Sequence, residues 1–536
     1  MRLARMGCSH PTRLSFLRQL LRRLQQEQWH FDRPVWDIDA NGVGQAVYRM
    51  SGPKRCYSLV AFAHDLPDEM RSDRVIATAW DATFTLFDGT PAPEDLHRLA
   101  QQVPLQEAGR LSASELSLSR ANRSVRLFDH VVQALAAGRQ PDRSQLEATG
   151  YLMRTTAVYG NGKFGAADRG RIRERPELRA PFQAEMLSVW LTRAFSVDLV
   201  EHLALAQGGT QATRLAPDLR RLLGVGNSTG LGMAPFLVRH PVLIHHWMQA
   251  REEALFLVRD QECATPETRE VFLQTLAEAQ ENAHQWSSEH PVQQTRLQEL
   301  RADLKKLEQF VEQEWSSQGP YPWETLWRWG ERHLTEEGQE ALLALLLEPH
   351  GALIDPLGSQ MEADEEREFS LRGSMPVGQI QALLRENYAA ALKLDYSARE
   401  NSTRFWYVSE EKLEPRLGER FEESGSEREQ PLDIGRQAQE LDQELQRWPE
   451  DQPIASVLLA HPHLRSIARR VQLSARYPYA EIQDNLIGAE LYPVDLLRCK
   501  LAFFGATRFD PRSDRWVRIS LFQNAPYPEE FNRDVR

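Results

Sequence analysis

Cysteine is scarce in this sequence, and its placement excludes two kinds of site. The 536 residues include four cysteines, at Cys8, Cys56, Cys263 and Cys499, and no two of them form a CxxC pair. Zinc sites and redox-active disulfides commonly depend on such close pairs. We therefore expect no metal, and free thiols in a reducing compartment.

Long apolar runs are also missing. The longest run, ALLALLLEPHGALI at 341–354, is interrupted by Glu348, Pro349 and His350. A membrane-spanning helix needs roughly 20 apolar residues. The first 26 residues carry six arginines and no acidic residue, but no signal-peptide core follows them. We expect a basic first helix and a cytoplasmic protein without membrane contact.

Positive charge is in deficit, and lysine is rare. The net charge of −12 argues against nonspecific nucleic-acid binding, which requires a cationic face. Only seven of the 64 basic residues are lysines, and Lys163 is the only one between Lys54 and Lys305. A lysine retained in an arginine-rich chain indicates a site where an ammonium group is needed.

The residue patterns predict an α+β fold that is predominantly α-helical. Strand-like segments rich in Val, Tyr, Thr and Phe occur at about 43–88 and again at about 499–526. Each group is too small to be stable alone, so we expect the two to form one small antiparallel sheet on a large helical body. Helical periodicity predicts helices at 93–102, 113–138, 143–157, 177–207, 216–223, 234–261, 266–287, 293–316, 323–333, 335–347, 376–393 and 432–447.

These patterns divide the chain into five expected segments. They are a basic helix with a β-meander (1–90), a helical domain with two glycine-rich loops (91–265), an antiparallel helical hairpin (266–318), a helical segment with acidic loops (319–450), and a C-terminal helix with a β-hairpin that completes the sheet (451–536).

The hairpin carries two apolar seams at heptad spacing. The seams are Phe272, Leu276, Ala279, Ala283 and Trp286 on one helix, and Leu297, Leu300, Leu304, Leu307 and Val311 on the other. Two interpretations remain open: an arm for self-association through 266–316, or ordinary bundle core.

The stretch GNSTGLG at 226–232 predicts an anion-binding loop. Gly226, Gly230 and Gly232 have the spacing of the cofactor loop of short-chain dehydrogenases, but the preceding APDLRRLLGV is typical of a helix rather than of the strand that this family requires. Backbone N–H groups of a glycine turn before a helix favour a negative group. Asn227, Ser228 and Thr229 add side-chain donors.

A second glycine cluster, YGNGKFG at 159–165, predicts the other half of the same site. It contains Tyr159, Asn161, Gly162 and Lys163, and Arg154 lies shortly before it. A lone lysine in a glycine bend beside an arginine is suited to a carboxylate or phosphate. The alternative is that both glycine clusters only end helices.

Other residues complete the predicted site. His245 and His246 are possible proton carriers, with Lys163 and Tyr159 as further catalytic candidates. His64, at the end of a predicted strand, is a weaker one. Arg404 and Tyr407 belong to a charged aromatic segment, and 476–493 is similar in composition.

The functional expectation is an enzyme of small-molecule metabolism. Its ligand would be a carboxylate or phosphate held by 159–165 and 226–232, with no cofactor assigned. The alternative is a noncatalytic helical scaffold or regulator that associates through 266–316, as a homo-oligomer or with a partner.

Overall fold

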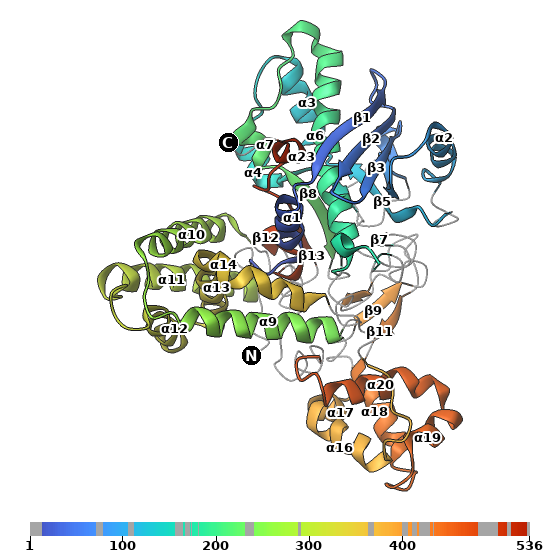
Figure 1. Cartoon of the computed structure of the whole chain (residues 1–536), viewed down its shortest axis with the longest axis vertical. Helices are drawn as coiled ribbons and strands as arrows, with labels where there is room; N and C mark the ends of the chain where they lie inside the picture. Colours follow the sequence, from blue (N-terminus) through green and yellow to red (C-terminus); the bar gives the residue numbers. More distant parts are fainter. Residues whose placement is uncertain are drawn as a thin grey trace. The chain divides into compact units, whose positions relative to one another are not determined.

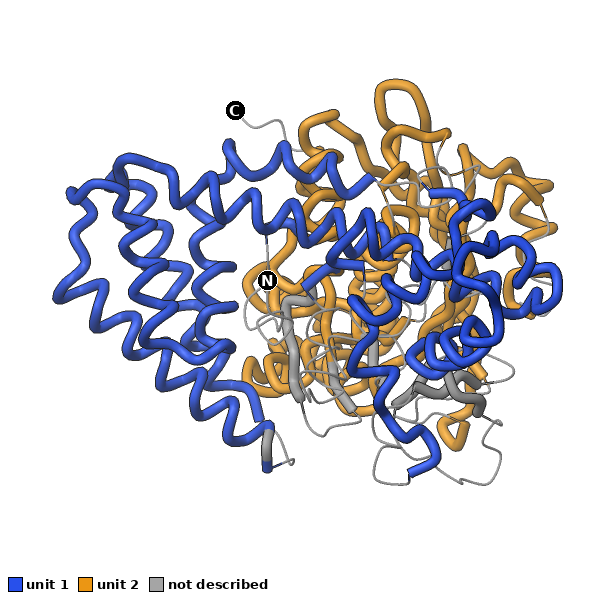
Figure 2. The backbone as a smooth tube through the Cα atoms, turned by 90° about the horizontal axis from the view of Figure 1, so that it is seen from below, with its two compact units in different colours: residues 1–14, 230–503, 511–517 blue, residues 15–229, 504–510, 518–536 orange. Residues whose placement is uncertain are grey.

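The computed structural model describes most of the chain and divides it into two compact units. The described residues are 13–70, 79–105, 112–155, 165–166, 172, 174–180, 182–230, 241–287, 291–362, 369–398, 406–409, 415–417, 429–432, 434–480, 502–511 and 516–532. The sheet unit comprises 15–229, 504–510 and 518–536, and the helical unit comprises 1–14, 230–503 and 511–517 (Figure 2).

The sheet unit contains a sheet with ten described strands. They are β1 (His30–Ile38), β2 (Gly44–Ser51), β3 (Cys56–Ala63), β4 (Ala82–Asp88), β5 (Glu115–Arg123), β6 (Tyr151–Thr155), β7 (Gly165–Ala166), β8 (Gly224–Gly230), β12 (Ala506–Pro511) and β13 (Trp516–Leu521). Their order is β1-β2-β3-β4-β5-β6-β8-β13-β12, with β7 paired to β5. Neighbours from β1 to β6 are antiparallel, whereas β6 and β8 are parallel, so the sheet is mixed.

The predicted small antiparallel sheet is therefore wrong. The terminal strands do enter one sheet, but β5, β6 and β8 stand between them. The sequence predicts helices over 113–138 and 143–157; residues 128–136 and 143–149 are helical, but β5 and β6 occupy 115–123 and 151–155. The helix α4 (Arg143–Thr149) ends at Gly150, whose φ of 77° is the left-handed cap that glycine favours, and the chain continues at once as β6.

Helices cover both faces of the sheet (Figure 1). The 26-residue α6 (Gln183–Gly208) is buried along most of its length, and its Phe195 ring lies 5.4 Å from that of Phe84 on β4. On the opposite face, Leu99 of α2 (Pro93–Gln102) joins a core cluster with Phe62 and Leu118. α1 (Phe16–Gln26), α3 (Phe128–Ala136) and α7 (Pro217–Arg221) also belong to this unit.

The helical unit begins with α9 (Pro241–Arg259) and a group of packed helices. These are α10 (Pro266–Gln285), α11 (Pro291–Gln313), α12 (Pro322–His333), α13 (Glu336–Leu347) and α14 (Gly351–Ile354). Every residue of the two predicted hairpin seams is buried. Phe272 of α10 contacts the Trp323 ring of α12 at 5.7 Å, and Asp303 of α11 accepts the Thr335 N–H at 2.7 Å.

The seams thus pack within the chain itself. On the described parts of α10 and α11, Val271 is the only large apolar side chain that is exposed. This arrangement matches the bundle-core interpretation, and association through 266–316 stays a prediction.

A second core of the helical unit lies nearer its C-terminal end. It is formed by α16 (Val377–Asn387), α17 (Ala389–Lys393), α18 (Ile434–Leu445), α19 (Ile454–Ala460) and α20 (Arg465–Ser474). The turns that begin α16 and α19 pair with each other at Pro376 and Pro453. A small sheet of β9 (Trp406–Ser409), β10 (Pro415–Leu417) and β11 (Glu429–Leu432) lies in a segment that we expected to contain only helices and loops.

One stretch, Glu336–Met361, is long and apolar enough to cross a membrane by length and composition alone. Half of its apolar window is buried inside the protein, and Leu342–Leu347 of α13 are buried almost completely. A core helix of a folded bundle has the same properties.

Candidate functional site: a polar row across the sheet

A row of polar residues crosses neighbouring strands at one end of the main sheet. Asn122 of β5 is the Cα partner of Arg154 of β6, which is the Cα partner of Gly226 of β8. Asp81, just before β4, donates its N–H to Asn122 Oδ1 at 2.9 Å, and its carbonyl accepts the N–H of His64 at 2.8 Å. Residues directly opposite on adjacent strands share a face. His64, Asp81, Asn122 and Arg154, hereafter the polar row, therefore lie along one face.

The centre of the polar row is buried and tightly hydrogen-bonded. Asp81 is fully buried, and its Oδ2 accepts the backbone N–H of Arg123 at 2.9 Å. Asn122 is also buried, and its Nδ2 donates to the carbonyl of Ala79 at 3.2 Å. Buried polar groups held in this way are fixed in orientation, because leaving either partner unsatisfied is costly.

His64 forms one end of the row. Its Nε2 lies 2.9 Å from Thr83 Oγ1, within hydrogen-bond distance. Burial lowers the pKa of His64, and the nearby Asp81 carboxylate offsets only part of that effect. The imidazole is consequently neutral at neutral pH and is able to accept a proton.

Arg154 forms the other end of the row and carries its positive charge, next to an irregularity in the sheet. From Tyr151 to Arg154 the chain advances three residues, while the partner strand advances two, from Gly224 to Gly226. This register shift is a β-bulge, a feature that re-aims side chains and is common beside active sites. Arg154 is 8% exposed. A guanidinium so placed is suited to bind a carboxylate or phosphate with two parallel hydrogen bonds.

Further arginines surround the row on β5 and in the turn after it. The Arg120 guanidinium stacks on the Trp80 ring at 3.7 Å, and that of Arg123 stacks on Phe128 at 4.6 Å. Arg126 Nη2 donates to the hydroxyl of Tyr151 at 3.3 Å. This end of the sheet therefore carries a concentration of positive charge within a chain of net negative charge.

The described part of the glycine stretch, 226–230, is a strand rather than the predicted loop. Residues 224–230 form β8, so Gly226, Asn227, Ser228, Thr229 and Gly230 are strand residues. A Cβ on Gly226 would lie 2.6 Å from the Tyr151 ring, which explains the glycine by close packing. The pairing with β6 overrides the low strand propensity of glycine and asparagine.

The structure brings only part of the predicted site together. Gly226 and Arg154 are neighbours, and Gly165, from the other cluster, pairs with Leu118 of β5 in the same sheet. Tyr159, Asn161, Gly162, Lys163 and Arg404 lie outside the described residues. Tyr407 lies on β9, where it is the Cα partner of Arg416 on β10.

The predicted histidines belong to the helical unit, on α9. His245 is buried, stacks on Tyr479 with ring centroids 5.5 Å apart, and contacts Tyr477 at 5.1 Å. His245 Nδ1 lies 3.4 Å from the Tyr479 backbone nitrogen, and the His246 ring lies 5.8 Å from Tyr477. The two histidines thus pack with the 476–480 segment, and their catalytic role stays a prediction.

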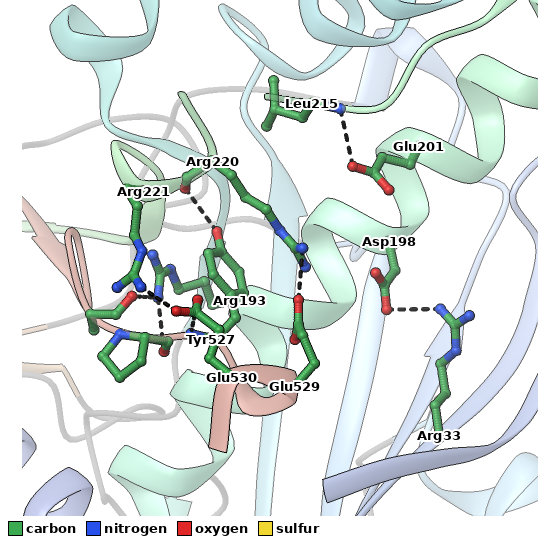
Figure 3. A network of polar contacts seen from close by, with 12 residues as sticks. Arg33, Arg193, Asp198, Glu201, Leu215, Arg220, Arg221, Tyr527, Glu529 and Glu530 are labelled. Carbon is green, nitrogen blue, oxygen red and sulfur yellow. Dashed lines mark hydrogen bonds and ion pairs between the residues drawn. The ribbon is translucent and has the colours of Figure 1, made fainter. Parts of the chain in front are cut away.

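A second polar network in the sheet unit surrounds Arg193 of α6 (Figure 3). Arg193 is fully buried, and its guanidinium stacks on the Tyr527 ring at 3.8 Å; Arg220 stacks on the same ring at 4.1 Å. Burial lowers the pKa of Arg193 to about 10. Arg221 pairs with Glu530, and Arg220 pairs with Glu529 at 2.7 Å.

Sequence reasoning missed Asp81, Asn122 and the arginines of β5. The segment SRANRSVR places Arg120, Arg123 and Arg126 at a spacing of three, which on the predicted helix would form a solvated face. The available signal was the alternation in ELSLSR, which is typical of a strand.

Comparisons with known proteins give no family to which the chain could be assigned. No family model, curated protein or solved structure matches this sequence. Among the described residues, no group of three or more histidine, cysteine, aspartate or glutamate side chains is arranged to hold a metal ion.

Proposed function

We propose that this protein is an enzyme that acts on a small molecule bearing a carboxylate or phosphate group, and that Arg154 binds that group. The observation that carries the proposal is the polar row, which aligns His64, Asp81, Asn122 and Arg154 on one face of the sheet. Such a gathering of a buried cation, a neutral imidazole and fixed hydrogen-bonding groups is typical of a catalytic site.

Each member of the row has a separate role in this proposal. Arg154 holds the anionic group, and His64 accepts or returns a proton on the bound molecule. Asp81 and Asn122 are positioning residues, because each fixes the backbone of its neighbour through the bonds described above. The bulge between Tyr151 and Arg154 directs the guanidinium.

The test uses thermal stability in the presence of single ligands. The parent protein and Arg154→Met are melted with a panel of carboxylates, phosphates and nucleotides. A ligand that binds the native state raises the melting temperature, by an amount that grows with its concentration relative to Kd. We expect at least one panel member to stabilise the parent and not the variant, and Arg154→Lys to bind it more weakly because lysine lacks the planar fork.

A matched control and a second variant sharpen the test. Arg143→Met removes an arginine of the same unit that is 57% exposed, and it should leave the ligand response unchanged. His64→Gln should still bind the ligand but should not convert it, as followed by mass spectrometry of the mixture. Equal stabilisation of the parent and Arg154→Met, or no response to any panel member, would refute the proposal.

A further inference from the structure

Arg193 connects three parts of the sheet unit that are far apart in sequence. From its place on α6, its Nε donates to the carbonyl of Leu223 at 2.6 Å, and its Nη1 donates to the carbonyl of Ala525 at 2.8 Å. Leu223 immediately precedes β8, and Ala525 lies in the segment after β13. A single buried guanidinium thus links α6, the start of β8 and the C-terminal segment.

The C-terminal segment Phe522–Asn532, hereafter the strap, is held by groups along its whole length. Arg221 Nη1 donates to the carbonyl of Asn524 at 2.9 Å, and Trp190 Nε1 donates to that of Pro526 at 2.8 Å. At the far end, the Asn532 side chain binds the backbone of Phe31 on β1 through both its oxygen and its nitrogen. Phe522 and Asn524 have φ values of 65° and 59°, which non-glycine residues seldom adopt.

The contacts of Arg193 lead directly to the polar row. Leu223 is followed by Gly224, whose N–H donates at 2.8 Å to the carbonyl of Gly150, the residue just before β6. Ser520 of β13 donates its hydroxyl to the same carbonyl at 2.9 Å. Two residues after Gly224 stands Gly226, the partner of Arg154. The position of Leu223 therefore sets where β8 runs beside Arg154.

We infer that Arg193 is a positioning residue, which uses the strap to hold β8 in register beside Arg154 and so sets the affinity of the candidate site. The existence of a ligand in this inference rests on the proposed function. The connection from Arg193 through β8 to Arg154 does not. Arginine is required because two donors must reach two carbonyls from one plane while the face of the group stacks on Tyr527. Lysine has a single nitrogen on a flexible stem, so it cannot donate to both carbonyls and also stack on the Tyr527 ring.

The experiment compares Arg193→Lys with the parent by hydrogen exchange and by ligand titration. We expect the variant to fold, because the positive charge and the packing stem are kept. Amides of Leu223–Gly226 and of the strap should exchange about tenfold to a hundredfold faster, which corresponds to the loss of one charge-assisted hydrogen bond. The panel ligand that stabilises the parent should bind at least about tenfold more weakly, since β8 is no longer fixed.

Two further variants separate this role from general stability. Arg33→Lys alters another arginine that contacts α6, through Asp198 at 2.8 Å. Among the described residues Arg33 has no bond to β8 or the strap, so both readouts should match the parent. Glu530→Gln weakens the attachment of the strap to α7, by neutralising the partner of Arg221, and should reproduce the exchange pattern more weakly even if Arg193→Lys fails to fold.

The outcomes are distinguishable from those of the proposed function. Unchanged exchange at Leu223–Gly226, or exchange that quickens equally in β3 and β4, would overturn the role of Arg193. If no panel ligand binds the parent, the enzyme proposal fails, while the exchange data still decide whether Arg193 and the strap hold β8.

Discussion

Arg154 and Gly226 are Cα partners across the parallel pair of β6 and β8, with a bulge on the arginine side of the pairing. Because Gly226 has no side chain, the ring of Tyr151 packs directly against its backbone. The missing side chain at Gly226 therefore allows both the close packing of β8 against β6 and the placement of Arg154 beside it. Single substitutions can test this.

Gly226→Ala should destabilise the protein. The added Cβ would lie 2.6 Å from the Tyr151 ring, and both residues are held in the sheet. Overpacking of this kind costs about 1–3 kcal/mol. Urea denaturation measures the change, and Gly319→Ala is the control, because its nearest contact would be an ordinary 3.5 Å. An equal effect of the two substitutions would contradict the packing described for β8.

Asn122→Ala should also lower the free energy of unfolding. It removes the acceptor of the buried Asp81 N–H and the donor to Ala79 O, so a buried donor loses its partner. The expected loss is about 1–3 kcal/mol. Asn387→Ala, which removes one bond at a half-buried position on α16, should cost less. A neutral result for Asn122→Ala would show that the polar row is not rigid.

The buried ion pair between Arg251 of α9 and Glu340 of α13 gives a test in the helical unit. Arg251 is fully buried and also stacks on Trp247 at 4.6 Å. Arg251→Met leaves a buried carboxylate without its cation and should cost about 3–5 kcal/mol. The double variant Arg251→Met, Glu340→Leu should recover most of that loss. A double variant as unstable as the single one would mean that packing, rather than charge, dominates at this contact.

His350 predicts a dependence of stability on pH. Burial lowers its pKa from 6.5 to about 4, beside the edge-on ring of Trp323 at 5.1 Å. Between these values the unfolded chain binds the proton more readily than the folded protein, so stability should fall as pH drops from 6.5 towards 4. Well above pH 6.5, from about pH 7.5, the histidine is neutral in both states, and its contribution is constant.

The measurement is the unfolding free energy of the parent and of His350→Leu at several pH values. The variant should lose less stability over this range, whereas His284→Gln, at an exposed position of α10, should follow the parent. Parallel pH profiles for the parent and His350→Leu would rule out His350 as a source of acid sensitivity.

The sequence was most informative where structure is local. The seams of α10 and α11 follow from apolar residues at heptad spacing, and all of those residues are buried. Helix starts such as Thr265 and Thr335 are capped by their own side chains. β2 and β3 lie within the first predicted strand segment, because a β-branched and aromatic composition acts within a few residues.

The tertiary structure alone decided the large sheet and the candidate site. β6 lies in a segment with helical spacing, and β8 is rich in glycine and small polar residues; both become strands because distant partners satisfy their backbone groups. Of the three, β5 alone begins with strand-like alternation, in ELSLSR. The polar row joins His64, Asp81, Asn122 and Arg154 only through that pairing. No local pattern specifies which strands pair. The register depends on the strand that lies alongside, and the sequence of one strand does not identify that neighbour.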